Sequence, residues 1–254
     1  MSRSGGAHTS RTMLLDELRA TLAATPSSFA LDDYRTAVID HNVAGKTTLS
    51  SRERTFRYLR ELYGLDLELP EFRAFRRLWN RDAASQPTMA LVMSLHRDRA
   101  FAATAPSVLQ LEVATPVSSK DLADAVDAEF PGAYSDSIRA KIGRNALSSW
   151  TQAGYLVRLD RFTVARAPTR PGPGAVAMAL VIASLDGRTG ERLFDAPIVA
   201  VLGTSTANLH DRAHEGSRKG WLDYRSKGAV TEVDLDALTA VPTDARMPLV
   251  VEAA

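Results

Sequence analysis

Apolar residues recur at steps of three and four along most of the chain, the spacing that gathers side chains on one face of an α-helix. The repeats predict helices over residues 13–24, 51–63 and 86–104, and a further helix that opens at Pro70. The residues that this further helix turns inward are Phe72, Phe75, Leu78 and Trp79.

The helix over residues 51–63 has recognisable signals at both ends. Ser50 and Glu53 have the spacing of a capping box, in which the serine accepts from a backbone amide and the glutamate reaches back to the cap. We therefore expect the helix to start at Ser51 and to stop at Gly64. Its buried stripe is expected to be Phe56, Leu59 and Tyr63, with Arg54 and Arg57 on the opposite side.

The middle of the chain has a different order of elements. Ser118 starts a helix that runs through Ala128. After a turn at "PGAY", Ser135 caps a second helix, which Gly154 stops. The stretch "YLVRLDRFTVAR" then alternates apolar and polar residues and predicts two short strands. Helix, turn, helix and hairpin in this order predict a winged helix-turn-helix module.

The second helix of this module has two chemically different faces. The apolar stripe consists of Ile138, Ile142, Ala146, Trp150 and Ala153. The opposite arc carries Ser137, Lys141, Arg144, Asn145, Ser148 and Gln152. Lysine and arginine can neutralise phosphates, and asparagine and glutamine can pair with adenine edges, so this arc predicts contact with a DNA groove. The expected wing is the hairpin with Arg158, Arg161 and Arg166.

The last third of the chain is separated by a linker, "TRPGPG", at residues 169–174. The longest apolar run, Val176 to Leu185, is about half of the roughly 20 residues that a membrane-spanning helix needs, so we expect a buried core helix. A polar helix around residues 207–216 and a hairpin with a Lys-Gly turn at residues 220–235 complete the prediction.

These patterns predict a mainly α protein with small β-hairpins, built of helical modules that include a winged helix-turn-helix. The expected divisions are a flexible lead-in and short helix (1–28), an N-terminal helical module with a basic helix (29–114), the winged helix-turn-helix (115–168), and a C-terminal helical module with a terminal hairpin (169–254).

The composition predicts a soluble, cytoplasmic protein. The 254 residues are 45% hydrophobic and 24% charged, enough for a large core and a solvated surface. The chain has no cysteine, which excludes disulfides and thiolate metal sites. Its first twelve residues lack the apolar region of a secretory signal and are expected to be disordered. No membrane association is expected.

The net charge of +1 conceals strong segregation. Residues 46–60 carry five basic residues against Glu53, and residues 138–170 carry seven against Asp160. Acidic residues concentrate elsewhere, at 118–137 and 229–254. Segregation of this kind predicts that two segments meet a polyanion, although an ordinary solvated surface is the simpler alternative.

Two short motifs suggest phosphoryl chemistry, but neither is complete. "GKTT" at residues 45–48 lacks the glycine of a phosphate-binding loop, because position 40 is Asp40. "HRD" at residues 96–98 resembles a kinase catalytic loop, yet Ala103 stands where the metal-binding asparagine belongs.

A third motif has the spacing of a zinc ligand pair. In "HDRAH", His210 and His214 lie one helical turn apart, with Asp211 between them. No third ligand is evident, so solvated histidines are the preferred interpretation. We expect no catalytic residue, no metal and no cofactor.

Four segments resemble the BrxA family of BREX phage-defence systems. They are "NVAGKTTLSSRERTFRYLRELYGLD" (42–66), "LHRDRAFAATAPSVL" (95–109), "YSDSIRAKIGRNALSSWTQAGYL" (134–156) and "RKGWLDYRSKGAVTEVDL" (218–235), in the same order as in the family. The resemblance implies a small, mainly helical protein with winged-helix-like modules that binds double-stranded DNA, without catalysis, alongside other BREX proteins. The linker at residues 166–174 has no counterpart in the family pattern.

The sequence therefore predicts a non-catalytic double-stranded DNA-binding component of a BREX-type defence system that contacts mainly phosphates. The alternative is a protein–protein adaptor whose basic faces dock acidic partners, and the basic helix at residues 51–63 could serve either role. The expected DNA-binding residues are Lys46, Arg54, Arg57, Lys141, Arg144, Asn145, Gln152, Arg158 and Arg161.

Overall fold

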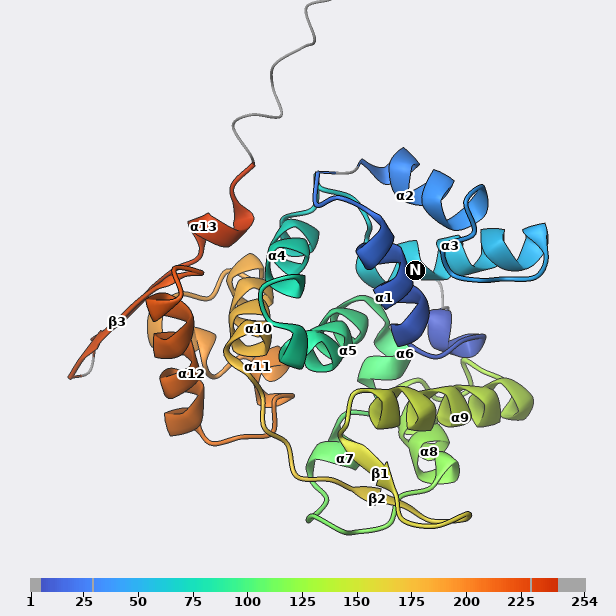
Figure 1. Ribbon diagram of the computed structural model, residues 1–254. Helices are drawn as coiled ribbons and strands as arrows, with labels where there is room; N and C mark the ends of the chain where they lie inside the picture. The colour runs from blue at the N-terminus through green and yellow to red at the C-terminus, as the bar shows by residue number, and fades with distance from the viewer. Residues whose placement is uncertain (1–5, 29, 229, 242–254) are drawn as a thin grey trace, which may run out of the picture.

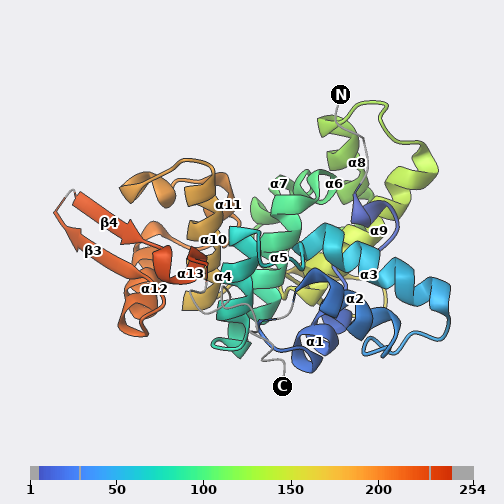
Figure 2. The same ribbon diagram turned by 90° about the horizontal axis from the view of Figure 1, so that it is seen from above.

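Helices dominate the fold, as predicted, and the strands form two small antiparallel hairpins. The computed structural model describes residues 6–28, 30–228 and 230–241. Helix α10 lies near the middle of the elongated molecule (Figures 1 and 2). Helices α3 and α9 lie toward one end, and helix α12 with the C-terminal hairpin lies at the other.

The described residues up to Leu109 form seven α-helices. Several begin with a proline at the first or second position, where the missing backbone N–H is not needed. Their bounds are α1 (Leu15–Ala24), α2 (Leu31–Ile39), α3 (Leu49–Tyr63), α4 (Pro70–Trp79), α5 (Gln86–Arg97), α6 (Arg99–Ala102) and α7 (Pro106–Leu109), with short 3-10 turns η1 (Ala7–Thr9) and η2 (Ala83–Ser85).

The predicted start of α3 is wrong by two residues. Thr48, with extended backbone, is the cap: its hydroxyl accepts from Ser51 N at 3.2 Å, and the Ser51 hydroxyl accepts from Thr48 N at 3.2 Å. The predicted Ser50 and Glu53 pair lies inside the helix. Gly64 ends the helix with a positive φ of 86°, as expected.

The single helix predicted over residues 86–104 is interrupted at Asp98. Its backbone is extended there, and its side chain starts α6 by accepting from Phe101 N at 3.1 Å. Aspartate at this point competes with helix continuation because it caps the next helix.

The N-terminal segment is folded where the structure describes it, contrary to the predicted disordered lead-in. Ala7, His8 and Met13 are fully buried, and η1 packs against both α3 and α9. The remaining residues of the predicted lead-in, 1–5, lie outside the described ranges.

The middle of the chain forms a helix pair followed by a hairpin. Gly143 permits the close approach of the two helices, because a Cβ at this position would overlap the Ser119 carbonyl oxygen. The two strands pair with Val157 opposite Ala165. Residue Pro116 adds a bridge to Ala165, and Val117 N donates to Val164 O at 2.9 Å. The elements are α8 (Ser119–Glu129), α9 (Asp136–Gln152), β1 (Leu156–Arg158) and β2 (Val164–Arg166).

The last third contains the predicted buried helix and terminal hairpin. Of the residues of α10, only Ser184 and Leu185 at its end are not buried, and α10 contacts α4, α5 and α12. Within the described ranges, no helix combines the length and apolar character needed to cross a bilayer. The elements are α10 (Pro173–Leu185), η3 (Gly190–Leu193), α11 (Pro197–Ala200), α12 (Thr206–Arg218), β3 (Asp223–Lys227), β4 (Val230–Asp234) and α13 (Asp236–Thr239).

One connected cluster of buried apolar side chains extends from Ala7 to Leu238 and includes residues from every predicted module. The inner face of α9 joins it through Ala146, Trp150 and Ala153. Ile142 belongs to a smaller cluster with Val126, whereas Ile138, predicted on the same stripe, is 40% exposed. The predicted modules therefore share a core, and their boundaries remain a prediction.

Candidate nucleic-acid interface

The outer face of α9 carries two exposed cationic side chains and two amide side chains that are hydrogen-bonded to other parts of the protein. Lys141 and Arg144 are exposed, and neither has a hydrogen bond or an ion pair to a described residue. Asn145 donates its amide to the His8 carbonyl at 2.8 Å. Gln152 donates weakly to Thr12 and Ser148, both at 3.4 Å. The folded N-terminal segment thus takes up the two amides that the sequence suggested for reading bases.

A hollow of about 320 Å³ lies where α8, α9 and β1 meet. Arg144 reaches its wall from α9 and Arg158 from β1, and Ser119 stands in the first turn of α8. None of the described residues that line it is acidic. Its lining residues are Ser119, Arg144, Leu147, Ser148, Thr151, Gln152 and Arg158. Two guanidinium groups, hydroxyls and a helix N-terminus form a favourable environment for one phosphate group.

Two nearby acidic residues are paired with an arginine of α9. Arg139 forms ion pairs with both Asp127 and Asp136. The hydrogen bonds that Arg139 donates to these two carboxylates raise the pKa of its guanidinium group. The acidity of the 118–137 segment is therefore partly compensated beside the exposed Lys141 and Arg144.

The hairpin carries two of its three predicted basic residues on the surface. Arg158 and Arg161 are exposed, and Arg158 Nη1 donates to the Arg161 carbonyl at 3.2 Å. Arg166, predicted as part of the wing surface, is 6% exposed and donates to the Tyr155 carbonyl at 3.1 Å and to the Ala167 carbonyl. Its side chain points inward, and these hydrogen bonds stabilise the base of the hairpin.

The basic residues predicted before and within α3 have different surroundings. Lys46 Nζ lies 2.6 Å from Glu17 Oε1 and is half-buried. Arg54 is exposed, and its Nε donates to Ser50 O at 3.2 Å. Arg57 is exposed and lies over the Tyr58 ring, 4.7 Å from its centroid.

The N-terminal segment links this helix to α9 and adds a cation that the sequence analysis missed. Arg11 lies 5.9 Å from the centroid of the Tyr58 ring. Burial alone would raise the pKa of Tyr58, but hydrogen bonds from Ser10 and Arg57 and the charges of Arg57 and Arg11 lower it. A lowered phenol pKa is what a locally positive potential produces.

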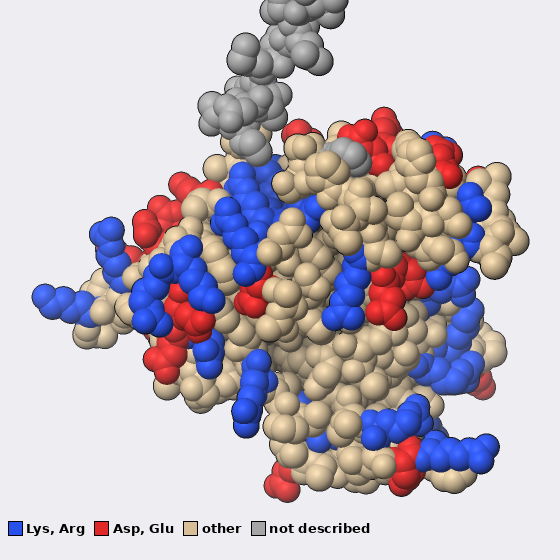
Figure 3. Space-filling view, in the orientation of Figure 1, with Lys and Arg blue, Asp and Glu red and all other residues tan. Residues whose placement is uncertain are grey.

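The basic side chains lie on more than one surface. Figure 3 shows lysine and arginine along the right-hand side, over the region of α3 and α9, and also over α4 and α12. Helices α3 and α9 occupy the same end of the molecule in both views of the ribbon (Figures 1 and 2). Both predicted basic segments therefore contribute to one end of the protein.

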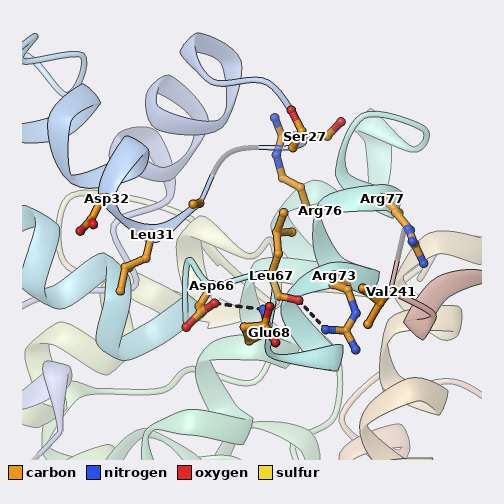
Figure 4. Close-up of a pocket in the computed structure, with 12 residues that line it drawn as sticks. Ser27, Leu31, Asp32, Asp66, Leu67, Glu68, Arg73, Arg76, Arg77 and Val241 are labelled. Carbon is orange, nitrogen blue, oxygen red and sulfur yellow. Dashed lines mark hydrogen bonds between the residues drawn. The ribbon is translucent and has the colours of Figure 1, made fainter. Parts of the chain in front are cut away.

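The arginines of α4 serve a structural role. They border a hollow of about 740 Å³ (Figure 4), yet each donates to main-chain carbonyls. Arg76 donates to the carbonyls of Leu22 and Thr25. Arg73 donates to those of Thr239 and Leu67, and Arg77 to those of Ala237 and Ala240. These contacts fasten α1 and α13 to α4 and leave fewer donors for a ligand.

A buried Ser–His–Asp arrangement was not foreseen. His8 Nδ1 lies 2.9 Å from Asp98 Oδ2, and His8 Nε2 lies 2.9 Å from Ser149 Oγ. The Ser149 hydroxyl donates to Asn145 O and accepts from Met13 N, both at 2.9 Å. Both ring nitrogens of His8 therefore have a hydrogen-bond partner inside the protein, the Asp98 carboxylate at Nδ1 and the Ser149 hydroxyl at Nε2.

This arrangement has a structural role, because it joins the N-terminal segment to Asp98 and to Ser149 of α9. We call it the latch. His8, Asp98 and Ser149 are at most 1% exposed, so a substrate cannot reach the serine. Burial alone would raise the pKa of Asp98, but hydrogen bonds and the charge from His8, with the Phe101 amide, lower it. The "HRD" motif contained Asp98, but only the fold reveals its partner, which lies 90 residues away.

The first histidine of the "HDRAH" motif, His210, contacts other side chains of the protein. His210 stacks on Phe194 with 4.0 Å between ring centroids. Its nitrogens contact Tyr224 Oη at 2.8 Å and Glu191 Oε1 at 3.1 Å. Among the described residues, no three His, Asp or Glu side chains are grouped to hold a metal. The aromatic and carboxylate partners use the donor atoms that a metal would need.

No protein family, curated protein or solved structure matches this chain. The resemblance to the BrxA family therefore remains a prediction from the four segments of the sequence.

Proposed function

We propose that this protein is a non-catalytic duplex DNA-binding protein that contacts chiefly phosphates. The observation that carries the proposal is that Arg144 and Arg158 line one hollow, whose described lining residues include no acid. One guanidinium group comes from a helix and the other from a strand, so the fold itself creates the pair. Such a pair can hold one backbone phosphate in a fixed position.

The order of elements supports a winged helix-turn-helix as the binding unit. A residue before α8 bridges to β2, then α8, α9 and the hairpin follow. In such a module α9 is the recognition helix and the β1–β2 hairpin is the wing. The proposed contacts are Lys141, Arg144, Arg158 and Arg161, with Arg54 and Arg57 of α3 as a second contact.

The BrxA resemblance supplies the proposed biological setting. A DNA-binding component of a BREX-type phage-defence system would act in the cytoplasm, with other BREX proteins as partners. The support is the order of the four segments in the sequence, together with a mainly helical fold.

The test is the affinity of the purified chain for a 30-base-pair duplex as a function of salt. If about six phosphates are contacted, affinity falls roughly a thousandfold between 50 and 200 mM salt. The Arg144→Ala, Arg158→Ala double variant should reduce the salt dependence by the equivalent of about two phosphates. The matched control is Arg218→Ala with Arg225→Ala, which removes the same charge from the opposite end. Equal losses in both double variants would refute the assigned site.

A second candidate function, an adaptor between proteins, is favoured by an apolar groove. The groove, of about 540 Å³, lies between α5, α7, α10 and α11, and its apolar walls include Leu109, Ile182 and Ile198. An adaptor would retard duplex DNA only in the presence of its protein partner, whereas the proposed DNA-binding protein does so alone.

A further inference from the structure

The tip of the β1–β2 hairpin exposes apolar side chains. Phe162 is 88% exposed, the largest fraction of any large hydrophobic residue in the described ranges. Leu159 is 58% exposed and Val157 44%. A single exposed apolar residue needs no explanation, but three on one short hairpin, led by an aromatic ring, indicate a contact surface.

The turn that presents Phe162 is held by its own hydrogen bonds. Asp160 Oδ1 accepts from Phe162 N at 2.7 Å and from Thr163 N at 2.8 Å, and Leu159 N donates to Thr163 O at 3.0 Å. The hydrogen bonds from the Phe162 and Thr163 amides lower the pKa of the Asp160 carboxyl. The ring is thus presented on an ordered turn, which reduces the entropy lost on binding.

Positive charge surrounds this apolar tip. Arg161 lies 5.5 Å from the centroid of the Phe162 ring, and Arg158 is exposed on the preceding strand. The one carboxylate of the tip, Asp160, faces backbone amides. An apolar ring between guanidinium groups matches a groove of duplex DNA, where phosphates flank the edges and faces of stacked bases.

The hairpin is also placed to reach such a groove. Figure 1 shows it projecting from the body of the molecule below α9, and Arg158 joins it to the hollow of Arg144. With α9 in the major groove, the tip would reach the neighbouring minor groove, where inserted phenylalanine or leucine unstacks a base step and bends the duplex.

We propose that the β1–β2 hairpin is an apolar wedge that inserts Phe162 into a base step of duplex DNA from the minor groove and bends the helix. This inference rests on the proposed DNA-binding function and adds a mode of contact to it. The wedge favours pyrimidine–purine steps, because these unstack most easily.

The test uses a 30-base-pair duplex with fluorophores at both ends and 2-aminopurine at a central TA step. On binding of the wild-type chain, end-to-end energy transfer should change as the duplex bends, and 2-aminopurine fluorescence should rise as the base unstacks. Phe162→Ala should abolish both signals and weaken binding by about tenfold, since one stacking contact is lost. The salt dependence should not change, because no charge is removed.

Two further variants serve as controls. Val230→Ala changes an exposed apolar residue of the other hairpin, 62% exposed, and should leave both signals intact. Phe162→Trp should restore bending that Phe162→Ala loses. All variants should keep the wild-type melting temperature, since Phe162 and Val230 are both largely exposed.

Three outcomes would overturn the wedge. If Phe162→Ala bends and unstacks the duplex like the wild type, the wedge is wrong while DNA binding stands. If the wild type binds no duplex, the proposed function fails and the wedge with it. If Phe162→Ala leaves DNA binding intact but abolishes sedimentation with vesicles of anionic phospholipid, the tip is a membrane contact.

Discussion

The two basic segments of this chain look alike in sequence and differ in the folded protein. Near α3, Lys46 is paired with Glu17, and Arg57 lies on the Tyr58 ring. On α9, Lys141 and Arg144 are exposed and have no hydrogen-bond or ion-pair partner among the described residues, and Arg158 of β1 lines the same hollow as Arg144.

The difference shows that a count of basic residues does not measure the charge available to a ligand. Seven basic residues cluster between positions 138 and 170. Of these, Arg139 forms ion pairs with two aspartates and Arg166 is buried. A partly buried ion pair satisfies a cation internally, whereas an exposed guanidinium group beside hydroxyls can still bind an anion. We therefore expect the α9 segment to dominate binding.

The largest effect is expected on the inner face of α9, which positions its outer face. Trp150 is fully buried, and its Nε1 donates to Thr104 Oγ1 at 2.9 Å. Trp150→Ala should lower the free energy of unfolding by about 3–5 kcal/mol, measured by urea denaturation. Ile138→Ala, on the same helix but 40% exposed, should change it by less than about 1 kcal/mol. Similar losses in both variants would contradict the difference in burial between these two side chains.

The next effect concerns the latch that holds the N-terminal segment between α3 and α9. Asp98→Ala should lower the free energy of unfolding by about 3 kcal/mol, because it leaves the buried amides of His8 and Phe101 and the buried His8 ring without their acceptor. Asp124→Ala is the control, since Asp124 pairs with Lys120 on the surface. A near-neutral Asp98→Ala would show that these buried hydrogen bonds do not stabilise the fold.

The latch should also weaken in acid. Because the pKa of Asp98 is lowered in the folded chain, its contribution is complete above the unfolded value of about 4 and is lost as pH falls through the folded pKa. Urea denaturation at pH 7 and below pH 4 should therefore show a difference between wild type and Asp98→Ala that shrinks in acid. A constant difference would exclude this linkage.

A smaller effect, on DNA affinity, separates the two basic segments directly. Arg144→Ala with Arg158→Ala should reduce affinity about thirtyfold, or about 2 kcal/mol, on duplexes of every length that binds. Arg54→Ala with Arg57→Ala should reduce affinity less. The loss should appear on a duplex of about 40 base pairs and vanish near 10, where only one module fits. If the α3 variant shows no loss at any length, α3 faces a protein partner.

The smallest effect is expected at Lys46. Lys46→Ala should lower the free energy of unfolding by less than about 1 kcal/mol, because its ion pair with Glu17 is only half-buried. DNA affinity should stay at the wild-type value, since the ammonium group is already paired. A loss equal to that of the Arg144 and Arg158 double variant would show that Lys46 is available to DNA after all.

Local patterns in the sequence were sufficient for most elements. The apolar steps of α9, the proline that opens α4, the alternating strands around Asp160 and the uniformly apolar α10 each depend on residues within a few positions of one another. Helix and strand periodicity and capping are local properties, so they can be read before the chain is folded. The start of α3 was misplaced because four neighbouring hydroxyl residues, Thr47, Thr48, Ser50 and Ser51, are candidates for the cap.

Tertiary structure decided which side chains remain available. Asn145 and Gln152 lie on the predicted face, but residues 8 and 12 return to occupy their amides. The same return pairs His8 with Asp98 and Ser149, across 90 and 141 positions of sequence. The hollow of Arg144 and Arg158 likewise exists only because Gly143 lets α8 approach α9 and the hairpin folds back beside them. Hydrogen bonds and ion pairs act over a few ångströms in space, whereas periodicity describes spacing along the chain, so the sequence determined the faces and the fold determined their partners.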